Sequence, residues 1–222
     1  EAAGMEVVET DLGEYIVQLA GDQPSHIIAP VVHRTRHDVA DLFCRRLGVD
    51  ASEVADIESI TAVARRTLRR AFLQADLGVT GANVLVAETG TVALVTNEGN
   101  GRFCTSVPRV HVAVAGIERI VPTLDDLGVL LRLLARSATG QALTSYTTLV
   151  TGPRRPAGNV GAPGARGEPD GPEQVHVILV DNGRRRILES DVAEILACIR
   201  CGACLNHCPV YRLIGGHAYG GV

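Results

Sequence analysis

The chain has 222 residues, of which 46% are hydrophobic and 21% are charged, a composition that allows a folded core and argues against disorder. A net charge of −4 and an aromatic content of 3% provide neither the basic surface nor the stacking side chains of nucleic-acid binding. No uncharged apolar run reaches the roughly 20 residues of a membrane-spanning helix. The length fits one large domain, or one domain with an appendage.

The first half of the chain alternates between apolar runs and helical patterns. Residues 26–32 predict a buried strand, 37–48 a helix that stops at Gly48, and 50–75 a longer helix capped by Asp50 or Ser52. Residues 83–96 predict a further strand, which we expect to bend or turn before Gly90 because this glycine interrupts the apolar run.

The second half continues the alternation. Residues 109–121 predict a strand, 123–139 a helix with Thr123 as N-cap, and 143–152 another strand. An extended loop is expected over 152–174, a strand over 174–183, and a helix that starts at Ser190 or Asp191 and runs into a group of cysteines. Strands separated by helices predict an α/β fold with a mainly parallel sheet flanked by helices.

Four of the six cysteines fall between residues 198 and 208, with the spacing Cys198-x2-Cys201-x2-Cys204-x3-Cys208 and a proline directly after the last. Structural zinc sites usually use two separated pairs, whereas this spacing is that of bacterial ferredoxins, so we expect a [4Fe–4S] site. Clustered cysteines in a chain rich in core-forming residues also favour a reducing cytoplasm over disulfides.

The fourth cysteine of such a run ligates the other cluster in two-cluster ferredoxins. By that rule Cys198, Cys201 and Cys204 would hold one cluster, and Cys208 would serve a second. A second run is absent from the printed chain. The two remaining cysteines, Cys44 and Cys104, are expected to pack as small apolar side chains.

A second candidate site lies around the strand at 83–96. Glu88 and Thr89 precede Gly90, and Asn97, Glu98 and Asn100 follow the strand in a glycine-rich turn. Ligands of α/β sheets bind outside the carboxyl ends of strands, where backbone N–H groups could hold a phosphate or carboxylate. The alternative is an ordinary β-hairpin with turn residues, and the sequence leaves both open.

Four histidines have a structural explanation in the sequence. His33 and His37 are four residues apart at a predicted helix start, and a metal pair there would need a third ligand that the sequence does not identify, so a solvated helix face is expected. His111 sits within an apolar strand, as does His176, and a core or edge position is expected for each.

Three stretches and the cysteine run carry a family resemblance. Residues 6–33, 81–102 and 170–188, followed by Cys198 to Cys208, resemble the family of lactate utilization protein B, the iron–sulfur subunit of a bacterial L-lactate oxidation complex. The resemblance implies a lactate-utilization domain over 1–189, similar to sugar-isomerase and CoA-transferase folds, and the first half of a ferredoxin-type segment over 190–222. Family members are longer at both ends, so we expect this chain to be a trimmed part of such a protein.

The resemblance also implies a function. Two [4Fe–4S] clusters in the parent protein would pass electrons during oxidation of L-lactate to pyruvate, with other subunits of the complex and a flavin or iron–sulfur protein as redox partner. The chain would then be a non-catalytic electron-transfer subunit. The alternative is a transferase-like enzyme domain that binds a small carboxylate or phosphate metabolite near Glu88 and Glu98, with accessory clusters.

Overall fold

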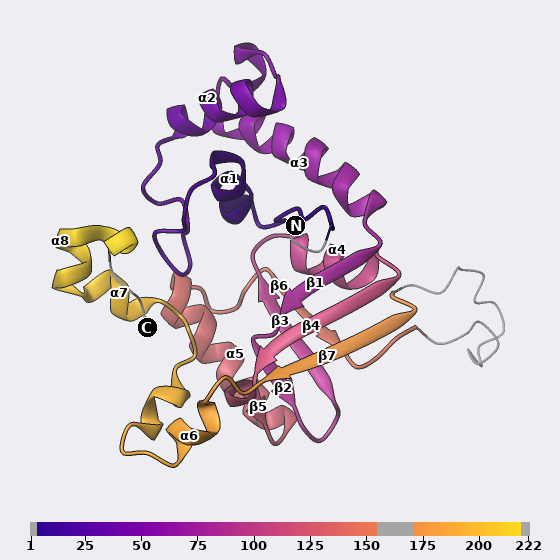
Figure 1. Ribbon diagram of the computed structural model, residues 1–222, viewed down its shortest axis with the longest axis vertical. Helices are drawn as coiled ribbons and strands as arrows, with labels where there is room; N and C mark the ends of the chain where they lie inside the picture. The colour runs from indigo at the N-terminus through magenta and orange to yellow at the C-terminus, as the bar shows by residue number, and fades with distance from the viewer. Residues whose placement is uncertain (1–3, 155–170, 219–222) are drawn as a thin grey trace. The chain divides into compact units, whose positions relative to one another are not determined.

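The computed structural model describes residues 4–154 and 171–218, and the chain divides into two compact units (Figure 1). Unit 1 comprises residues 1–71 and 200–222, so it joins the two ends of the chain. Unit 2 comprises residues 72–199. Within the described residues no helix is long and apolar enough to cross a membrane.

Unit 1 begins with helices whose ends follow directly from the sequence. They are α1 (Leu12–Ala20), α2 (Arg36–Leu47), the 3₁₀ turn η1 (Ala51–Val54) and α3 (Ile57–Gln74), whose last residues belong to unit 2. Thr35 and Asp38 form a capping box at the start of α2, and Gly48 ends it in a left-handed conformation with φ of 67°. The predicted helix at 37–48 is therefore confirmed.

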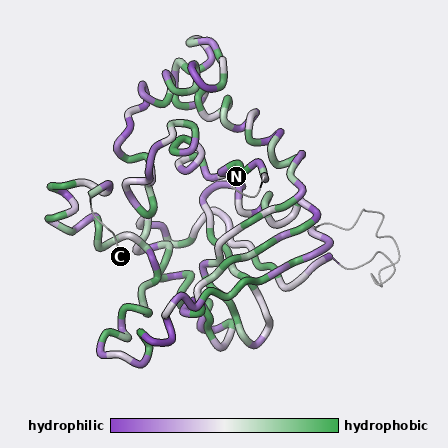
Figure 2. Tube along the Cα trace, in the orientation of Figure 1, coloured by the Kyte–Doolittle hydropathy of each residue, from purple (hydrophilic) through white to green (hydrophobic). Residues whose placement is uncertain are grey.

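The core of unit 1 forms where the apolar stripes of these helices meet. Phe43 of α2 is fully buried, and Tyr15 of α1 packs edge-on against it with ring centroids 6.5 Å apart. The other buried members come from α1, α2, η1 and α3: Ile16, Val39, Leu42, Val54, Ile60, Val63 and Ala64. In Figure 2, hydrophobic and hydrophilic residues alternate along α2 and α3, as they do in amphipathic helices, where each turn contributes to both faces.

Unit 2 contains a three-stranded parallel sheet in the order β1-β4-β7. Its strands are β1 (Leu77–Gly81), β4 (Val110–Gly116) and β7 (Gln174–Val180), which lie side by side in Figure 1. His111 at the centre of this sheet is fully buried, and its Nε2 lies 2.9 Å from the hydroxyl of Thr80. The prediction of a core or edge position is therefore confirmed for both histidines, since His176 is exposed on the edge strand β7.

The second sheet of unit 2 is mixed, in the order β5-β2-β3-β6. Strands β2 (Val84–Val86) and β3 (Thr91–Thr96) pair antiparallel, β3 pairs antiparallel with β6 (Tyr146–Val150), and β2 pairs parallel with the short β5 (Ile120–Val121). One side of this sheet packs on helix α5 (Leu124–Thr139), and the other shares a buried cluster with β4. The prediction of an α/β fold is confirmed, but only one of the two sheets is parallel.

Short helices complete the chain. Unit 2 also holds α4 (Asn100–Ser106), η2 (Ile117–Arg119), α6 (Arg184–Leu188) and η4 (Ala193–Ala197), and unit 1 ends with α7 (Ala203–His207) and α8 (Pro209–Ala218). The helix expected from Ser190 or Asp191 is thus only a 3₁₀ segment from Ala193. Most of the loop expected at 152–174 lies outside the described residues, since 155–170 are not among them.

The strand predicted at 26–32 is wrong, because this segment closes its hydrogen bonds locally. The backbone N–H groups of Ile28 and Ala29 both donate to Nδ1 of His26, at 3.0 and 3.1 Å, and the N–H of Ser25 donates to the carbonyl of Pro30 at 3.0 Å. Pro30 has no N–H to offer to a neighbouring strand. The segment is therefore a loop of turns, although its composition is that of a strand.

The longer helical prediction at 50–75 covers two elements. Asp50 starts the 3₁₀ turn η1, in a capping box with Glu53, and α3 begins only at Ile57. The N–H of Ser59 donates to the Asp56 carboxylate at 2.8 Å, so Asp56 caps α3 in place of the expected Asp50 or Ser52.

Candidate functional site

The cysteine run lies on a sharp change of chain direction. Cys198 ends η4, Arg200 and Gly202 take left-handed φ values of 58° and 72°, and Cys204 lies in the short helix α7. The boundary between the two units falls after Ile199, so Cys198 belongs to unit 2 and the other three cysteines to unit 1. Left-handed residues let the backbone reverse its direction within a few positions.

None of the four cysteines forms a disulfide within the described residues, and one sulfur already accepts a backbone hydrogen bond. The N–H of Tyr211 points to Sγ of Cys208 at 3.5 Å. Cys204 is exposed, and Cys198, Cys201 and Cys208 are half-buried. Backbone N–H groups directed at cysteine sulfurs are a feature of iron–sulfur sites, where they adjust the reduction potential.

Within unit 2, the backbone at Cys198 is held by an arginine whose role no sequence pattern indicates. Nη1 of Arg119 donates to the carbonyl of Cys198 at 3.2 Å. The Arg119 guanidinium lies 3.6 Å from the carboxylate of Glu118, which also pairs with Arg184. The Glu118 side chain is only 9% exposed, so a nearly buried carboxylate holds both arginines in place.

Within unit 1, the segment that carries the other cysteines packs on the loop between α1 and α2. The hydroxyl of Tyr211 donates to the carbonyl of Ser25 at 2.7 Å, and Nε2 of His26 lies 3.2 Å from Oδ1 of Asn206. A Cβ at Gly202 would lie 2.7 Å from the side chain of Ile27. Any side chain at Gly216 would overlap the Ser25 carbonyl, so the contact depends on glycine at that position.

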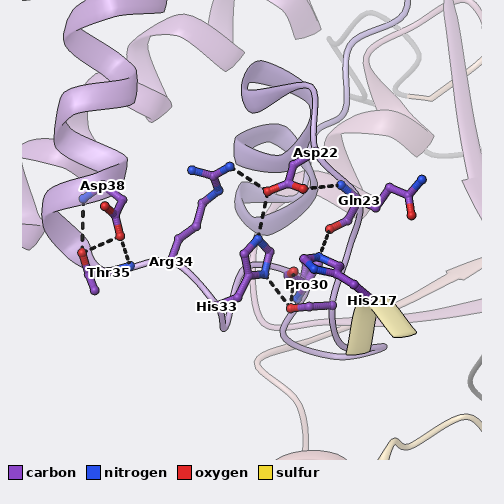
Figure 3. Close-up of polar contacts among 9 residues, drawn as sticks. Asp22, Gln23, Pro30, His33, Arg34, Thr35, Asp38 and His217 are labelled. Carbon is purple, nitrogen blue, oxygen red and sulfur yellow. Dashed lines mark hydrogen bonds and ion pairs between the residues drawn. The ribbon is translucent and has the colours of Figure 1, made fainter. Parts of the chain in front are cut away.

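Further along α8, His217 reaches the same loop (Figure 3). Its Nε2 lies 2.9 Å from the carbonyl oxygen of Gln23, and its ring packs edge-on against His33 with centroids 4.7 Å apart. His33 precedes α2 and faces Asp22, with Nε2 3.0 Å from Oδ2. His33 therefore does not belong to a solvated helix face with His37, and this part of the prediction is wrong.

The two candidate groups around β3 lie at opposite ends of that strand. Glu88 and Thr89 occupy the turn between β2 and β3, where Gly90 has a φ of 66°. Oε1 of Glu88 accepts the N–H of Leu124 at 2.7 Å, and the Thr89 hydroxyl lies 2.7 Å from that of Thr91. The expected turn before Gly90 is confirmed, and Glu88 assists the start of α5.

Asn97, Glu98 and Asn100 follow β3. Nδ2 of Asn97 donates to Gln141 at 2.8 Å and its Oδ1 accepts the N–H of Ser145 at 3.0 Å, so this side chain ties two loops together. The carbonyl of Glu98 accepts the Thr96 hydroxyl. Oδ1 of Asn100, at the start of α4, is buried without a hydrogen-bond partner among the described residues. The six residues of β3 separate this group from Glu88 and Thr89 by about 20 Å.

The two cysteines outside the run occupy packing positions. Cys44 is half-buried against the core of unit 1. Cys104 of α4 is buried in unit 2, where a Cβ at Gly78 of β1 would overlap its carbonyl oxygen. Gly78 therefore permits α4 to approach β1, and both cysteines have the surroundings expected of small apolar side chains.

The fold and the cysteine run together place the chain in a class of proteins in which an α/β domain carries a candidate iron–sulfur segment. Residues 1–180 match the LUD domain, and the chain belongs to that family. The resemblance to lactate utilization protein B is thereby confirmed.

Three curated relatives illustrate the similarity. The uncharacterized electron transport protein YkgF of Escherichia coli (strain K12) is 51% identical over 220 residues, which are 99% of this chain and 44% of that protein. Lactate utilization protein B of Bacillus licheniformis is 51% identical and that of Bacillus subtilis (strain 168) 49% identical, each over 100% of this chain and 44% of the relative. The chain thus spans less than half the length of these relatives.

One solved structure also aligns, a DUF162 family protein from Deinococcus radiodurans. The alignment covers 49% of this chain and 56% of that one, with 26% identity and a TM-score of 0.33. This TM-score is too low to establish a shared fold.

Proposed function

We propose that the chain is the LUD domain and first cysteine run of an iron–sulfur electron-transfer subunit that serves the oxidation of L-lactate to pyruvate. The observation that carries the proposal is the run Cys198-x2-Cys201-x2-Cys204-x3-Cys208, in a chain about half identical to an electron transport protein and to lactate utilization protein B. The redox partner would be a flavin or iron–sulfur protein, and other subunits of a lactate-oxidising system would bind the protein in the cytoplasm.

The residues present fit a [4Fe–4S] cluster. Cys198, Cys201 and Cys204 offer three thiols with ferredoxin spacing, and the sulfur of Cys208 accepts the Tyr211 N–H. A bound cluster would supply one-electron oxidation and reduction. The protein contributes ligation, the backbone hydrogen bond at Cys208, and the anchoring of the Cys198 carbonyl by Arg119.

The alternative, an enzyme domain that binds a small carboxylate or phosphate, receives less support. Glu88 assists the start of α5, and Asn97 holds two loops, so each side chain has a structural contact that accounts for it. The unpartnered Oδ1 of Asn100 is the feature that favours a ligand there. A sugar-isomerase or CoA-transferase type of fold stays a prediction of the family resemblance.

Iron and sulfide content tests the electron-transfer proposal. The protein, expressed as its own gene encodes it, is reconstituted anaerobically with iron and sulfide, and both are counted per chain. We expect Cys201→Ser to lose one cluster's iron, since a thiolate ligand is removed. Cys44→Ala is the matched control, because Cys44 packs against the unit 1 core, and it should keep the wild-type content.

The Cys208→Ser variant distinguishes two ligation patterns. If Cys208 serves a second cluster, as in two-cluster ferredoxins, this variant keeps the iron held by Cys198, Cys201 and Cys204 and loses the other set. If all four cysteines ligate one cluster, its loss equals that of Cys201→Ser. Unchanged iron and sulfide in Cys201→Ser would contradict the cluster assignment.

A further inference from the structure

Asp22, His33 and His217 bring three metal-binding groups together outside the cysteine run. Each residue offers one ligand atom, and these atoms all lie within 4.8 Å of one another. Figure 3 shows that Asp22 and His33 come from the loop between α1 and α2, and His217 comes from α8. All three belong to unit 1, so the arrangement is internal to that unit.

The hydrogen bonds of His33 determine which of its nitrogens is free to bind a cation. The hydroxyl of Ser25 is 3.2 Å from the Pro30 carbonyl, to which it donates, and 2.6 Å from Nδ1 of His33. Because a hydroxyl has one proton, Ser25 accepts from His33, and Nδ1 carries the hydrogen. Nε2 faces the Asp22 carboxylate at 3.0 Å, and it either carries a proton that it donates to Asp22 or, without that proton, offers a lone pair to a metal ion.

Nε2 of His33 and the Asp22 carboxylate would repel each other as two bare acceptors, so a proton or a metal ion must lie between them. Asp22 is held as a carboxylate by several donors. The Gln23 N–H donates to Oδ1 at 2.9 Å, and Nη2 of Arg34 donates to Oδ2 at 2.6 Å. A negatively charged oxygen beside a neutral imidazole is the donor pair that divalent transition metals prefer.

His217 has the same type of supporting contact. Its Nε2 donates to the carbonyl oxygen of Gln23 at 2.9 Å, since a carbonyl can only accept. Nδ1 is therefore the nitrogen with a lone pair. Histidines that bind metals nearly always donate their other N–H to a carbonyl or similar acceptor, which fixes the ring orientation. Both histidines meet this condition before any metal is bound.

Arg34 leaves room for a cation at Asp22. Its Nη2 donates to Oδ2 at 2.6 Å, and a carboxylate oxygen has a second lone pair, which faces Nε2 of His33. A metal ion between Oδ2 and His33 would take over that lone pair, and Arg34 would keep its contact. Ligands of tetrahedral zinc lie about 3.3 Å apart, close to the 3.0 Å between Asp22 and His33.

His33 also borders a cavity of about 390 Å³ on the surface of unit 1, lined among others by Asn206, Tyr211 and Arg212. Three protein ligands and an open side are the composition of zinc sites that keep a position for water or an anion.

We propose that Asp22, His33 and His217 form a binding site for one divalent first-row transition metal ion, with Zn²⁺ as the best match to two imidazoles and a carboxylate. The site is distinct from the cysteine run and does not depend on the proposed electron-transfer function. By joining the loop before α2 to α8, the ion would link the two ends of the chain within unit 1.

Zinc binding by matched variants tests this site. Zn²⁺ is titrated into the full chain, and bound zinc is counted after removal of the free ion. We expect His217→Gln to bind one equivalent less than wild type, because glutamine keeps a donor for the Gln23 carbonyl but has no imidazole lone pair. Asp22→Asn and His33→Gln should show the same loss.

Two controls separate this equivalent from adventitious binding and from the cysteines. His176→Gln removes an exposed histidine of β7 and should bind as much zinc as wild type. Cys201→Ser should keep the equivalent that His217→Gln loses. Zinc X-ray absorption of wild type should contain nitrogen and oxygen neighbours at about 2.0–2.1 Å that are missing from His217→Gln, whereas cysteine ligation gives sulfur at about 2.3 Å.

Equal zinc content in wild type and His217→Gln would overturn the proposal. An absorption spectrum that shows sulfur neighbours alone in wild type would do the same, since the zinc would then be bound entirely by the cysteines. Because the readout is bound metal, it does not depend on whether the iron–sulfur assignment holds.

Discussion

Glu14, in the first turn of α1, titrates far from its usual range. Its half-buried carboxyl loses hydration, and the neighbouring Asp11 adds a hydrogen bond and a repulsive charge, which together raise the pKa of Glu14 from 4.5 to about 8. As a carboxylate, its Oε2 has no donor among the described residues. As an acid it can donate to Asp11, so folding favours the protonated form.

This shift predicts that stability falls as the pH rises. Between about pH 4.5 and 8 the unfolded chain loses the Glu14 proton while the folded chain keeps it, so the free energy of unfolding decreases. A shift of this size would amount to several kcal/mol, but water screens a half-exposed group, and we expect about 1–2 kcal/mol. Glu14→Gln should exceed wild type by that amount at pH 8 and match it at pH 4.

Denaturant unfolding at the two pH values checks the prediction, with Glu58→Gln as control. Glu58 is in the first turn of α3 and exposed, so its replacement should not change the pH profile. A Glu14→Gln variant whose stability relative to wild type is the same at both pH values would show that the Glu14 carboxyl is ionised in the folded protein.

Single residues were predictable from sequence where local chemistry determines them. The left-handed Gly48 and the capping Thr123 follow from helix-end preferences. Asp22, Ser25 and His217 were not singled out, because their roles depend on contacts between the two ends of the chain. Nothing in the local pattern around His33 indicates that its partner is His217, which is 184 positions further on.

Among the elements, α5 shows most clearly how sequence determines a helix start. The hydroxyl of Thr123 accepts the Asp126 N–H, and the Asp126 carboxylate accepts the Thr123 N–H at 3.1 Å. Glu88 adds a third acceptor for the Leu124 N–H. Leu127 of this helix is buried against β2 and β3, so the cap fixes the first turn of a helix that covers the mixed sheet.

Loss of this cap should cost stability. Thr123→Ala is expected to lower the free energy of unfolding by about 1 kcal/mol, since the Asp126 N–H loses its acceptor at the helix end. Thr61→Ala is the matched control, because the Thr61 hydroxyl donates only to the Ile57 carbonyl within α3 and alanine is the better helix former. Chemical denaturation measures both, and equal stabilities of the two variants would contradict the capping role.

The predicted secondary structure is wrong where the composition of a segment favours one structure and its hydrogen bonds form another. Residues 26–32 have the apolar composition of a strand, but His26 and Ser25 supply the backbone contacts that a sheet would otherwise provide. Strand β1 was missed because Gly78 and Gly81 weaken its apolar pattern, although Gly78 is the residue that lets α4 approach. In both segments, the observed structure depends on contacts that the local apolar pattern does not reveal.

At the scale of the whole molecule, the sequence was sufficient for the family and the α/β class but not for the arrangement of strands. Antiparallel pairing of β3 with β2 and β6 divides the strands between two sheets, and this depends on which apolar faces pack together. The joining of both chain ends in unit 1 also required the structure, since it brings Ser25 to Tyr211 across 186 positions.

In the proposed function, the cysteine run holds a redox-active iron–sulfur cluster. Electron paramagnetic resonance of the reconstituted protein, before and after reduction under anaerobic conditions, tests it most directly. We expect a paramagnetic cluster signal that appears on reduction in wild type and in Cys44→Ala, and that is lost or altered in Cys201→Ser. Identical signals in wild type and Cys201→Ser, or no signal on reduction of the iron-loaded wild-type protein, would contradict it.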